Sequence, residues 1–207
     1  MHAQKQSLRS LFVRLAAGAL ALGLNFGLSS AALAFDNPQV ALKTTMGEIV
    51  IELDQENAPK STANFLQYVK SGFYKGTVFH RVIDGFMIQG GGYTEKLVDK
   101  PGVRKPIASE AKNGLSNKPY TVAMARTDNP NSATSQFFIN VNDNAGLDYP
   151  GMDGHGYTVF GRVVKGHETV DKIKAVVVDD VRGMQNVPVT PIVIQSTSVL
   201  SGEKLVK

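Results

Sequence analysis

The residues just after position 39 have the pattern of two short strands, the second of which is half-buried. The first stretch covers 40–45 and the second covers 48–53, and Met46-Gly47 joins them. Charged and apolar residues alternate along the second stretch. This pattern predicts two strands connected by a short turn.

A helix is predicted to follow these strands. Pro59 suits the first turn of a helix, where its missing N–H costs no hydrogen bond. Residues of one face then recur at helical spacing at Thr62, Phe65, Leu66 and Val69. Gly72 suits the left-handed position that ends a helix.

Strand patterns dominate the rest of the chain. They cover Thr77–Ile83, Tyr120–Ala125, Phe137–Val141, Tyr157–Val164 and Ile192–Leu200, with connections rich in Gly, Asn, Asp and Pro. A second short helix is predicted over His167–Lys174, with Val170 and Ile173 on its apolar face. Many short strands and two helices indicate a mainly β fold, a closed antiparallel barrel capped by the helices.

The N-terminal residues have the pattern of a signal peptide. Basic residues precede an apolar run over 15–28, and cleavage is predicted after Ala34. The run is shorter than the ~20 residues of a membrane-spanning helix, although an uncleaved N-terminal anchor is an alternative. We therefore divide the chain into a signal peptide, 1–34, and one domain, 35–207, with no stable membrane insertion after cleavage.

Most of the excess positive charge belongs to the signal peptide. The chain carries a net charge of +4, and Lys5, Arg9 and Arg14 account for three of these charges, which leaves +1 for the domain. This balance does not indicate nucleic-acid binding. The chain has no cysteine, so the domain must be stable without disulfides. It also lacks Asn-x-Ser/Thr motifs, which favours a bacterial envelope, and we expect a periplasmic protein.

The strand around position 81 places a permanent cation among apolar residues. Alternation predicts that Phe79, Arg81 and Ile83 share one face, while His80 and Val82 point to the other. Taken alone, Arg81 also fits a solvated arginine on a strand. Its neighbours favour a guanidinium fixed beside an apolar pocket.

A second segment repeats this combination of polar and aromatic residues. Gln136 and Phe138 are predicted to share a face of their strand, while Phe137 and Ile139 point the opposite way. An arginine donates hydrogen bonds without losing its charge. Such a site suits a reaction that needs no nucleophile, metal or cofactor.

Several spaced blocks of this sequence resemble one known family. The motif Phe79-His80-Arg81-Val82-Ile83-x-Gly85-Phe86-Met87-x-Gln89-Gly90-Gly91 resembles the signature of the cyclophilin-type peptidyl-prolyl cis–trans isomerases. Later blocks appear in the same order as Met124-Ala125, Ser135-Gln136-Phe137-Phe138-Ile139 and Val159-Phe160-Gly161. The exported bacterial members are most similar in appearance. The resemblance implies an eight-stranded antiparallel barrel with two helices, and isomerisation of X–Pro bonds in unfolded or partly folded proteins without a cofactor.

The resemblance also implies a role for each residue of the site. Arg81, Phe86 and Gln89 would be catalytic. Substrate binding would use Met87, Ala125, Arg126, Gln136, Phe138, Leu147 and Tyr157. Phe86, Met87 and Phe138 would form the proline pocket, with Leu147 at its edge. The two glutamines would bind the substrate and help to orient Arg81, and Ala125 and Arg126 would line the groove for the residues before proline.

Three positions depart from the best-known eukaryotic pattern. Tyr157 stands where histidine is common, and Arg126 stands where asparagine is common. Gly146 replaces a bulky aromatic residue, usually tryptophan, that helps to bind cyclosporin. We expect turnover to survive these changes and cyclosporin binding to be weak.

Other functions fit the chain less well. A cyclophilin-like chaperone or binding module without turnover is the main alternative, but the motif residues are intact. An exported hydrolase lacks a serine with a histidine or acid at a suggestive spacing. The histidines lack metal-ligand spacing, so we expect no metal site. Gly90-Gly91-Gly92 is predicted to form a tight turn. We expect the protein to be a monomer.

Overall fold

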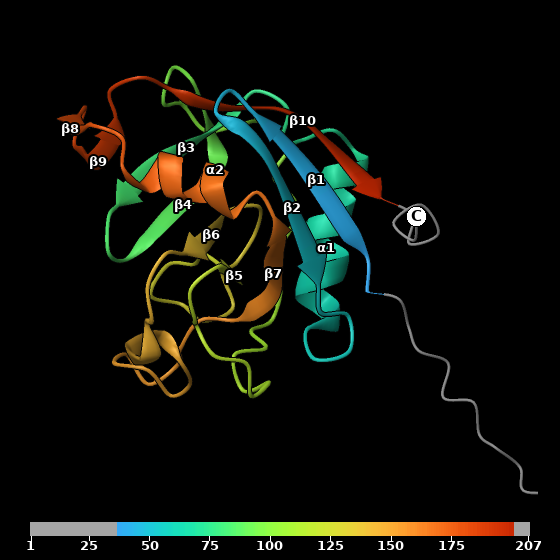
Figure 1. The fold of residues 1–207 in the computed structure, drawn as a ribbon. Helices are drawn as coiled ribbons and strands as arrows, with labels where there is room; N and C mark the ends of the chain where they lie inside the picture. The colour runs from blue at the N-terminus through green and yellow to red at the C-terminus, as the bar shows by residue number, and fades with distance from the viewer. Residues whose placement is uncertain (1–36, 201–207) are drawn as a thin grey trace, which may run out of the picture. The chain divides into compact units, whose positions relative to one another are not determined.

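The computed structural model describes residues 37–200, which contain a closed barrel of eight strands (Figure 1). Neighbouring strands are antiparallel, and β2 closes the barrel on β1. In barrel order the strands are β1 (Gln39–Thr44), β10 (Ile192–Leu200), β3 (Thr77–Ile83), β4 (Met87–Thr94), β6 (Phe137–Asn140), β5 (Thr121–Met124), β7 (Val159–Lys165) and β2 (Gly47–Leu53). The predicted fold class is confirmed.

The predicted signal peptide, 1–34, lies outside the described residues. The predicted cleavage point after Ala34 lies outside them as well. Within 37–200 the structure contains no helix that is long and apolar enough to cross a membrane.

Both predicted helices are present and add side chains to the core of the barrel. α1 (Pro59–Lys70) begins at the predicted proline, and Gly72 follows its end with a φ of 69°. α2 (His167–Lys174) has the predicted bounds. Phe65 of α1 and Val170 of α2 are fully buried in the same apolar cluster as the inward side chains of the strands.

Aromatic rings fill the centre of this core. Phe65 meets Phe137 edge to face at a centroid distance of 5.4 Å, and it lies 5.3 Å from Phe160. Phe137 also meets Phe79 of β3 edge to face at 6.0 Å. Such tilted pairs pack densely. They support β3 and β6 from the inside, and the opposite face of these strands is left for other contacts.

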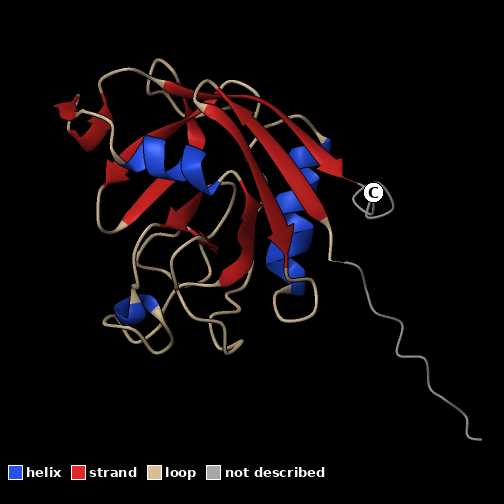
Figure 2. Cartoon of the chain, viewed as in Figure 1, coloured by secondary structure: helices blue, strands red, loops and turns tan. Residues whose placement is uncertain are grey.

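Some elements have no counterpart in the sequence prediction. β4 was not predicted as a strand. β8 (Val178–Val181) and β9 (Met184–Pro188) form a separate two-stranded sheet. A short 3-10 helix, η1 (Ala145–Leu147), lies in the long connection between β6 and β7 (Figure 2).

The tight turn predicted at residues 90–92 is wrong, because these glycines lie inside β4. A Cβ atom on Gly91 would lie 2.9 Å from the rings of Phe137 and Tyr74. A Cβ atom on Gly92 would lie 2.5 Å from the side chain of Gln136. Glycine is needed here because any larger residue would push β4 away from these neighbours.

Phe79 and Arg81 do not share a face, contrary to the alternation rule. Phe79 is 1% exposed and belongs to the core together with Val82. The register of β3 against β4 shifts between Phe79 and Arg81. This irregularity is a β-bulge, which reverses the alternation of side chains. Beyond it, Arg81 and Ile83 lie on the outer face of the strand.

Candidate active site

A second apolar cluster, here called the outer cluster, lies apart from the core. Its buried members come from four neighbouring strands and are Met87, Ala123, Phe138 and Val159. Partly buried side chains pack around them, namely Ile83, Phe86, Leu115, Ala125, Leu147 and Tyr157. The structure thus brings together all six apolar and aromatic residues that were predicted for the site: Phe86, Met87, Ala125, Phe138, Leu147 and Tyr157.

A row of polar side chains borders the outer cluster. Arg81 on β3 lies opposite Gln89 on β4, and Gln89 lies opposite Phe138 on β6. Nε2 of Gln89 donates a hydrogen bond to Oε1 of Gln136 at 2.9 Å. Arg81, Gln89 and Gln136 are all half-buried. They therefore remain partly accessible from solvent.

The connection from β3 to β4 positions Phe86 beside this row. Oδ1 of Asp84 accepts a hydrogen bond from the N–H of Gly85 at 2.9 Å, and Gly85 has a φ of 75° that suits glycine. The carbonyl of Phe86 accepts hydrogen bonds from the N–H of Val141 at 3.0 Å and from Nδ2 of Asn144 at 2.8 Å. Both donors follow β6, so the turn is tied to the next strand of the site.

Leu147 and Tyr157 add another wall. The N–H of Tyr157 donates a hydrogen bond to the carbonyl of Leu147 at 2.8 Å. The ring of Tyr157 meets that of Phe138 at a centroid distance of 5.7 Å and an interplanar angle of 75°. An aromatic side chain with a hydroxyl group therefore stands at the edge of the outer cluster.

A pocket of about 190 Å³ adjoins the polar row. It is lined by the predicted site residues Gln89, Ala125, Arg126 and Gln136, and by Thr127, Ser132 and Thr134. Ala125 belongs both to this pocket and to the outer cluster. This pocket, here called the groove, therefore adjoins the apolar outer cluster through Ala125.

Arg126 lines this groove, but its guanidinium is bound within the protein. Nε and Nη2 donate hydrogen bonds to the carbonyl of Gly156 at 3.1 and 2.8 Å, and Nη1 donates to the carbonyl of Thr127 at 3.0 Å. Nη2 also forms an ion pair with Asp153. The guanidinium lies over the ring of Tyr157, 4.1 Å from its centroid. Arg126 therefore brings little free charge to the groove.

Sequence reasoning gave no site role to four members of the outer cluster. Ile83 was predicted to share a face with Arg81, and this is confirmed. Ala123 lies two residues before Ala125 on the same strand face, so the alternation of side chains along the strand could have indicated it. Alternation could have indicated Val159 in the same way. Leu115 comes from the long connection between β4 and β5. No period in such a connection indicates which side chain meets the barrel.

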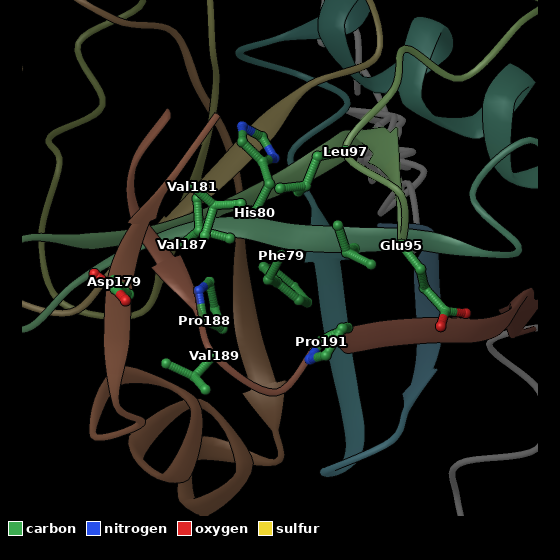
Figure 3. Close-up of a pocket in the computed structure, with 11 residues that line it drawn as sticks. Phe79, His80, Glu95, Leu97, Asp179, Val181, Val187, Pro188, Val189 and Pro191 are labelled. Atoms are coloured by element: carbon green, nitrogen blue, oxygen red, sulfur yellow. The ribbon is translucent and has the colours of Figure 1, made fainter. Parts of the chain in front are cut away.

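A different pocket, of about 260 Å³, lies between β3 and the β8–β9 sheet (Figure 3). His80 and Phe79 line it from β3, and Val181 and Val187 line it from the sheet. His80 is 7% exposed. Burial lowers the pKa of His80 to about 4, and the positive charge of Arg81 acts in the same direction. His80 is therefore a neutral structural residue at physiological pH.

Residues 39–199 match the family model described as "Cyclophilin type peptidyl-prolyl cis-trans isomerase/CLD". The chain belongs to the cyclophilin family. The peptidyl-prolyl cis-trans isomerase of Streptomyces antibioticus is 55% identical to this cyclophilin over 163 residues, which cover 78% of this chain and 98% of the relative. Peptidyl-prolyl cis-trans isomerase A of Dickeya dadantii is 52% identical over 172 residues, which cover 83% and 90% respectively.

Solved structures give the same picture of this cyclophilin. A cyclophilin-type isomerase of Cryptosporidium parvum matches it with a TM-score of 0.66 at 27% identity, over 80% of this chain and 98% of that chain. Another structure of the C. parvum protein was determined in the presence of the dipeptide Ala-Pro. This cyclophilin is a peptidyl-prolyl cis–trans isomerase.

Proposed function

We propose that this cyclophilin accelerates rotation of X–Pro bonds in exported proteins as they fold in the bacterial periplasm. The catalytic part of the proposal is carried by one observation. Arg81, Gln89 and Gln136 come from strand positions next to the apolar side chains of the outer cluster. A proline ring suits the apolar cluster, and the peptide around it suits the polar row.

The rotation breaks amide resonance and no covalent bond, against a barrier of about 18–20 kcal/mol. When the amide twists, the prolyl nitrogen regains its lone pair. A donor aimed at that nitrogen therefore binds the twisted state more tightly than the planar one. Arg81 would supply this donor, since its guanidinium keeps its charge. Gln89, held by Gln136, would bind the substrate and orient Arg81.

Arg81 alone would not account for a large acceleration. One preorganised donor contributes about 3–4 kcal/mol. An acceleration of about 10⁵-fold needs roughly 7 kcal/mol. The difference would come from the outer cluster, where Phe86, Met87 and Phe138 exclude water from the carbonyl and hold the proline ring while the acyl side turns.

Two-dimensional exchange NMR on a Pro-containing peptide tests these roles. We expect Arg81→Ala to lower kcat/KM by about 100-fold or more, because the donor is lost. Arg81→Lys keeps the charge without the planar fork of donors, so it should recover only part of the rate. The matched control is Arg162→Ala, which removes a 67% exposed guanidinium paired with Glu52 at 2.7 Å.

Each outcome of that experiment has a definite meaning. A wild-type rate in Arg81→Ala, with an unchanged thermal unfolding curve, would refute the role of Arg81. Peptide binding by the wild type without cis–trans exchange would instead favour a chaperone or binding module without turnover. Loss of activity in Arg162→Ala would show that charge in general, and not the position of Arg81, controls the rate.

Export is the second part of the proposal. The basic residues and the apolar run before Ala34 support it. Expression of the full chain in a Gram-negative bacterium, followed by fractionation and N-terminal sequencing, should give a periplasmic protein that begins at Phe35. Leu20→Arg interrupts the apolar run and should block export. A wild-type chain that is cytoplasmic would refute export, and an uncleaved membrane-bound chain would indicate an anchor.

A further inference from the structure

We propose that Asp153 is a positioning residue that acts through Arg126 to hold Tyr157 against the outer cluster. The proposal rests on the site proposed above, in which Tyr157 forms one wall. It concerns the loop of residues 148–156, which leads from η1 back to Tyr157.

The loop 148–156 has little apolar packing of its own. Most of its residues are exposed, and Met152 is 87% exposed. Its two ends meet where the N–H of Tyr157 bonds the carbonyl of Leu147. A segment with few buried apolar contacts opens locally at a low free energy. Polar contacts must therefore decide where this loop, and the tyrosine at its end, lies.

Arg126 connects the loop to the barrel. It lies two residues after the end of β5, and it donates two hydrogen bonds to the carbonyl of Gly156, the residue before Tyr157. Its guanidinium also lies 4.1 Å from the centroid of the Tyr157 ring, within the range of a cation–π contact. Arg126 thus contacts both the backbone that carries Tyr157 and the ring itself, so displacement of Arg126 displaces Tyr157.

Asp153 fixes this guanidinium from within the loop. Oδ2 accepts a hydrogen bond from Nη2 of Arg126. Oδ1 accepts hydrogen bonds from the backbone N–H groups of His155 at 2.9 Å and Gly156 at 3.0 Å. The hydrogen bond from Arg126, with those from the backbone, holds the pKa of Asp153 well below its usual range. The carboxylate is therefore charged at neutral pH and joins the loop backbone to Arg126.

Burial makes the contact between Arg126 and Asp153 important. The side chain of Arg126 is only 4% exposed, whereas that of Asp153 is 41% exposed. Removing the charge of Asp153 leaves a buried guanidinium without its counter-ion, and such a group moves toward water. Arg126 would then leave the ring of Tyr157 and release the loop. The predicted effect is a looser wall of the proline site.

The test compares Asp153→Asn with the wild type. Asparagine keeps the acceptor for His155 and Gly156 and removes the charge that pairs with Arg126. We expect KM for a Pro-containing peptide to rise about fivefold with a smaller change in kcat, because a wall that binds the substrate is lost. The matched control is Asp143→Asn, which removes a carboxylate from an exposed ion pair with Lys118. It should leave KM unchanged.

NMR of Arg126 tests the contact independently of catalysis. In the wild type the ring of Tyr157 should shift the NMR signal of the Arg126 Nε–H. This proton should also exchange slowly with water. In Asp153→Asn this signal should move to the position of a solvated arginine, and ¹⁵N relaxation should show added motion in 148–156. Arg126→Lys, which cannot form the same fork, should reproduce the added motion in 148–156 and the rise in KM, and it serves as the second variant if Asp153→Asn unfolds.

An unchanged KM together with an unchanged Arg126 signal in Asp153→Asn would overturn the proposal. A changed signal with unchanged kinetics would also overturn it, since the contact would then be purely structural. Failure of the proposed site is recognised separately, as full activity of Arg81→Ala.

Discussion

Gln89 donates a hydrogen bond to Gln136 at 2.9 Å, and this bond joins β4 to the segment that leads into β6. Gln89 also lies opposite Arg81 in the register of β3 and β4. Gln89 is therefore paired in register with the proposed catalytic cation and hydrogen-bonded to Gln136. Loss of the Gln136 side chain should therefore loosen the polar row without opening the core.

Gln136→Ala should lower kcat/KM by about tenfold, which is the order expected for one hydrogen bond in a preorganised site. The thermal midpoint should change little, because Gln136 is only half-buried. Exchange NMR and a thermal melt measure the two quantities. Gln39→Ala removes a comparable hydrogen bond, to Glu52 at 3.3 Å, far along the sequence from the site. Equal activity of both variants would show that the Gln89–Gln136 bond is dispensable.

Phe86→Ala should separate catalysis from stability. The ring is half-buried at the edge of the outer cluster, and the backbone bonds of Phe86 do not depend on it. We expect kcat/KM to fall about tenfold or more, while the protein loses about 1 kcal/mol of unfolding free energy. Phe160→Leu, within the core, should lower the unfolding free energy and leave kcat/KM nearly unchanged. The hypothesis fails if the two variants lose activity to the same extent.

His80 should make the stability of the protein depend on pH. Its folded-state pKa is lowered to about 4, so between pH 6.5 and 4 the unfolded chain binds a proton that the folded chain does not. The stabilisation is complete above about pH 6.5 and is lost as the pH falls, by about 3 kcal/mol in total. Urea unfolding at several pH values measures this loss. The His80→Gln variant should lack this part of the pH dependence, and identical slopes for both proteins would contradict the assignment.

Gly146→Trp should strengthen cyclosporin binding. A Cβ atom at this position would lie 3.5 Å or more from the side chain of Met152, an ordinary contact distance, and Gly146 is exposed. A larger residue therefore fits here without strain. We expect a gain in affinity of about fivefold or more, since a stacked aromatic group contributes about 1 kcal/mol or more. Isothermal calorimetry with Gly146→Ala as the control measures it, and equal affinities would dismiss the role of this position.

The regular elements of this fold could be predicted because their signals are local. Pro59 and Gly72 mark the ends of α1 through their own backbone preferences. The bounds of β3, β10 and α2 follow directly from strand and helix periods. Phe86, Met87, Ala125 and Phe138 were expected in the candidate site because they stand in the blocks that resemble the family, and the outer cluster contains all four.

Predictions failed where a residue's environment comes from a distant part of the chain. The bulge before Arg81 depends on how β3 pairs with β4, so alternation along β3 alone misplaced Phe79. The glycines of β4 were predicted to form a turn, because the rings that require glycine at these positions belong to other elements. Phe137 carries one of these rings. Asp153 is exposed, and only the folded chain brings its carboxylate against the buried guanidinium of Arg126.

The strands and helices with clear periods, the family, and the residue types available for catalysis follow from the amino-acid sequence, since each depends on a local repeat or an ordered motif. The face that Arg81 occupies and the binding of the Arg126 charge by Asp153 follow from the folded barrel alone. These features arise when the barrel closes and brings residues that are far apart in sequence into contact, and no local pattern records such contacts.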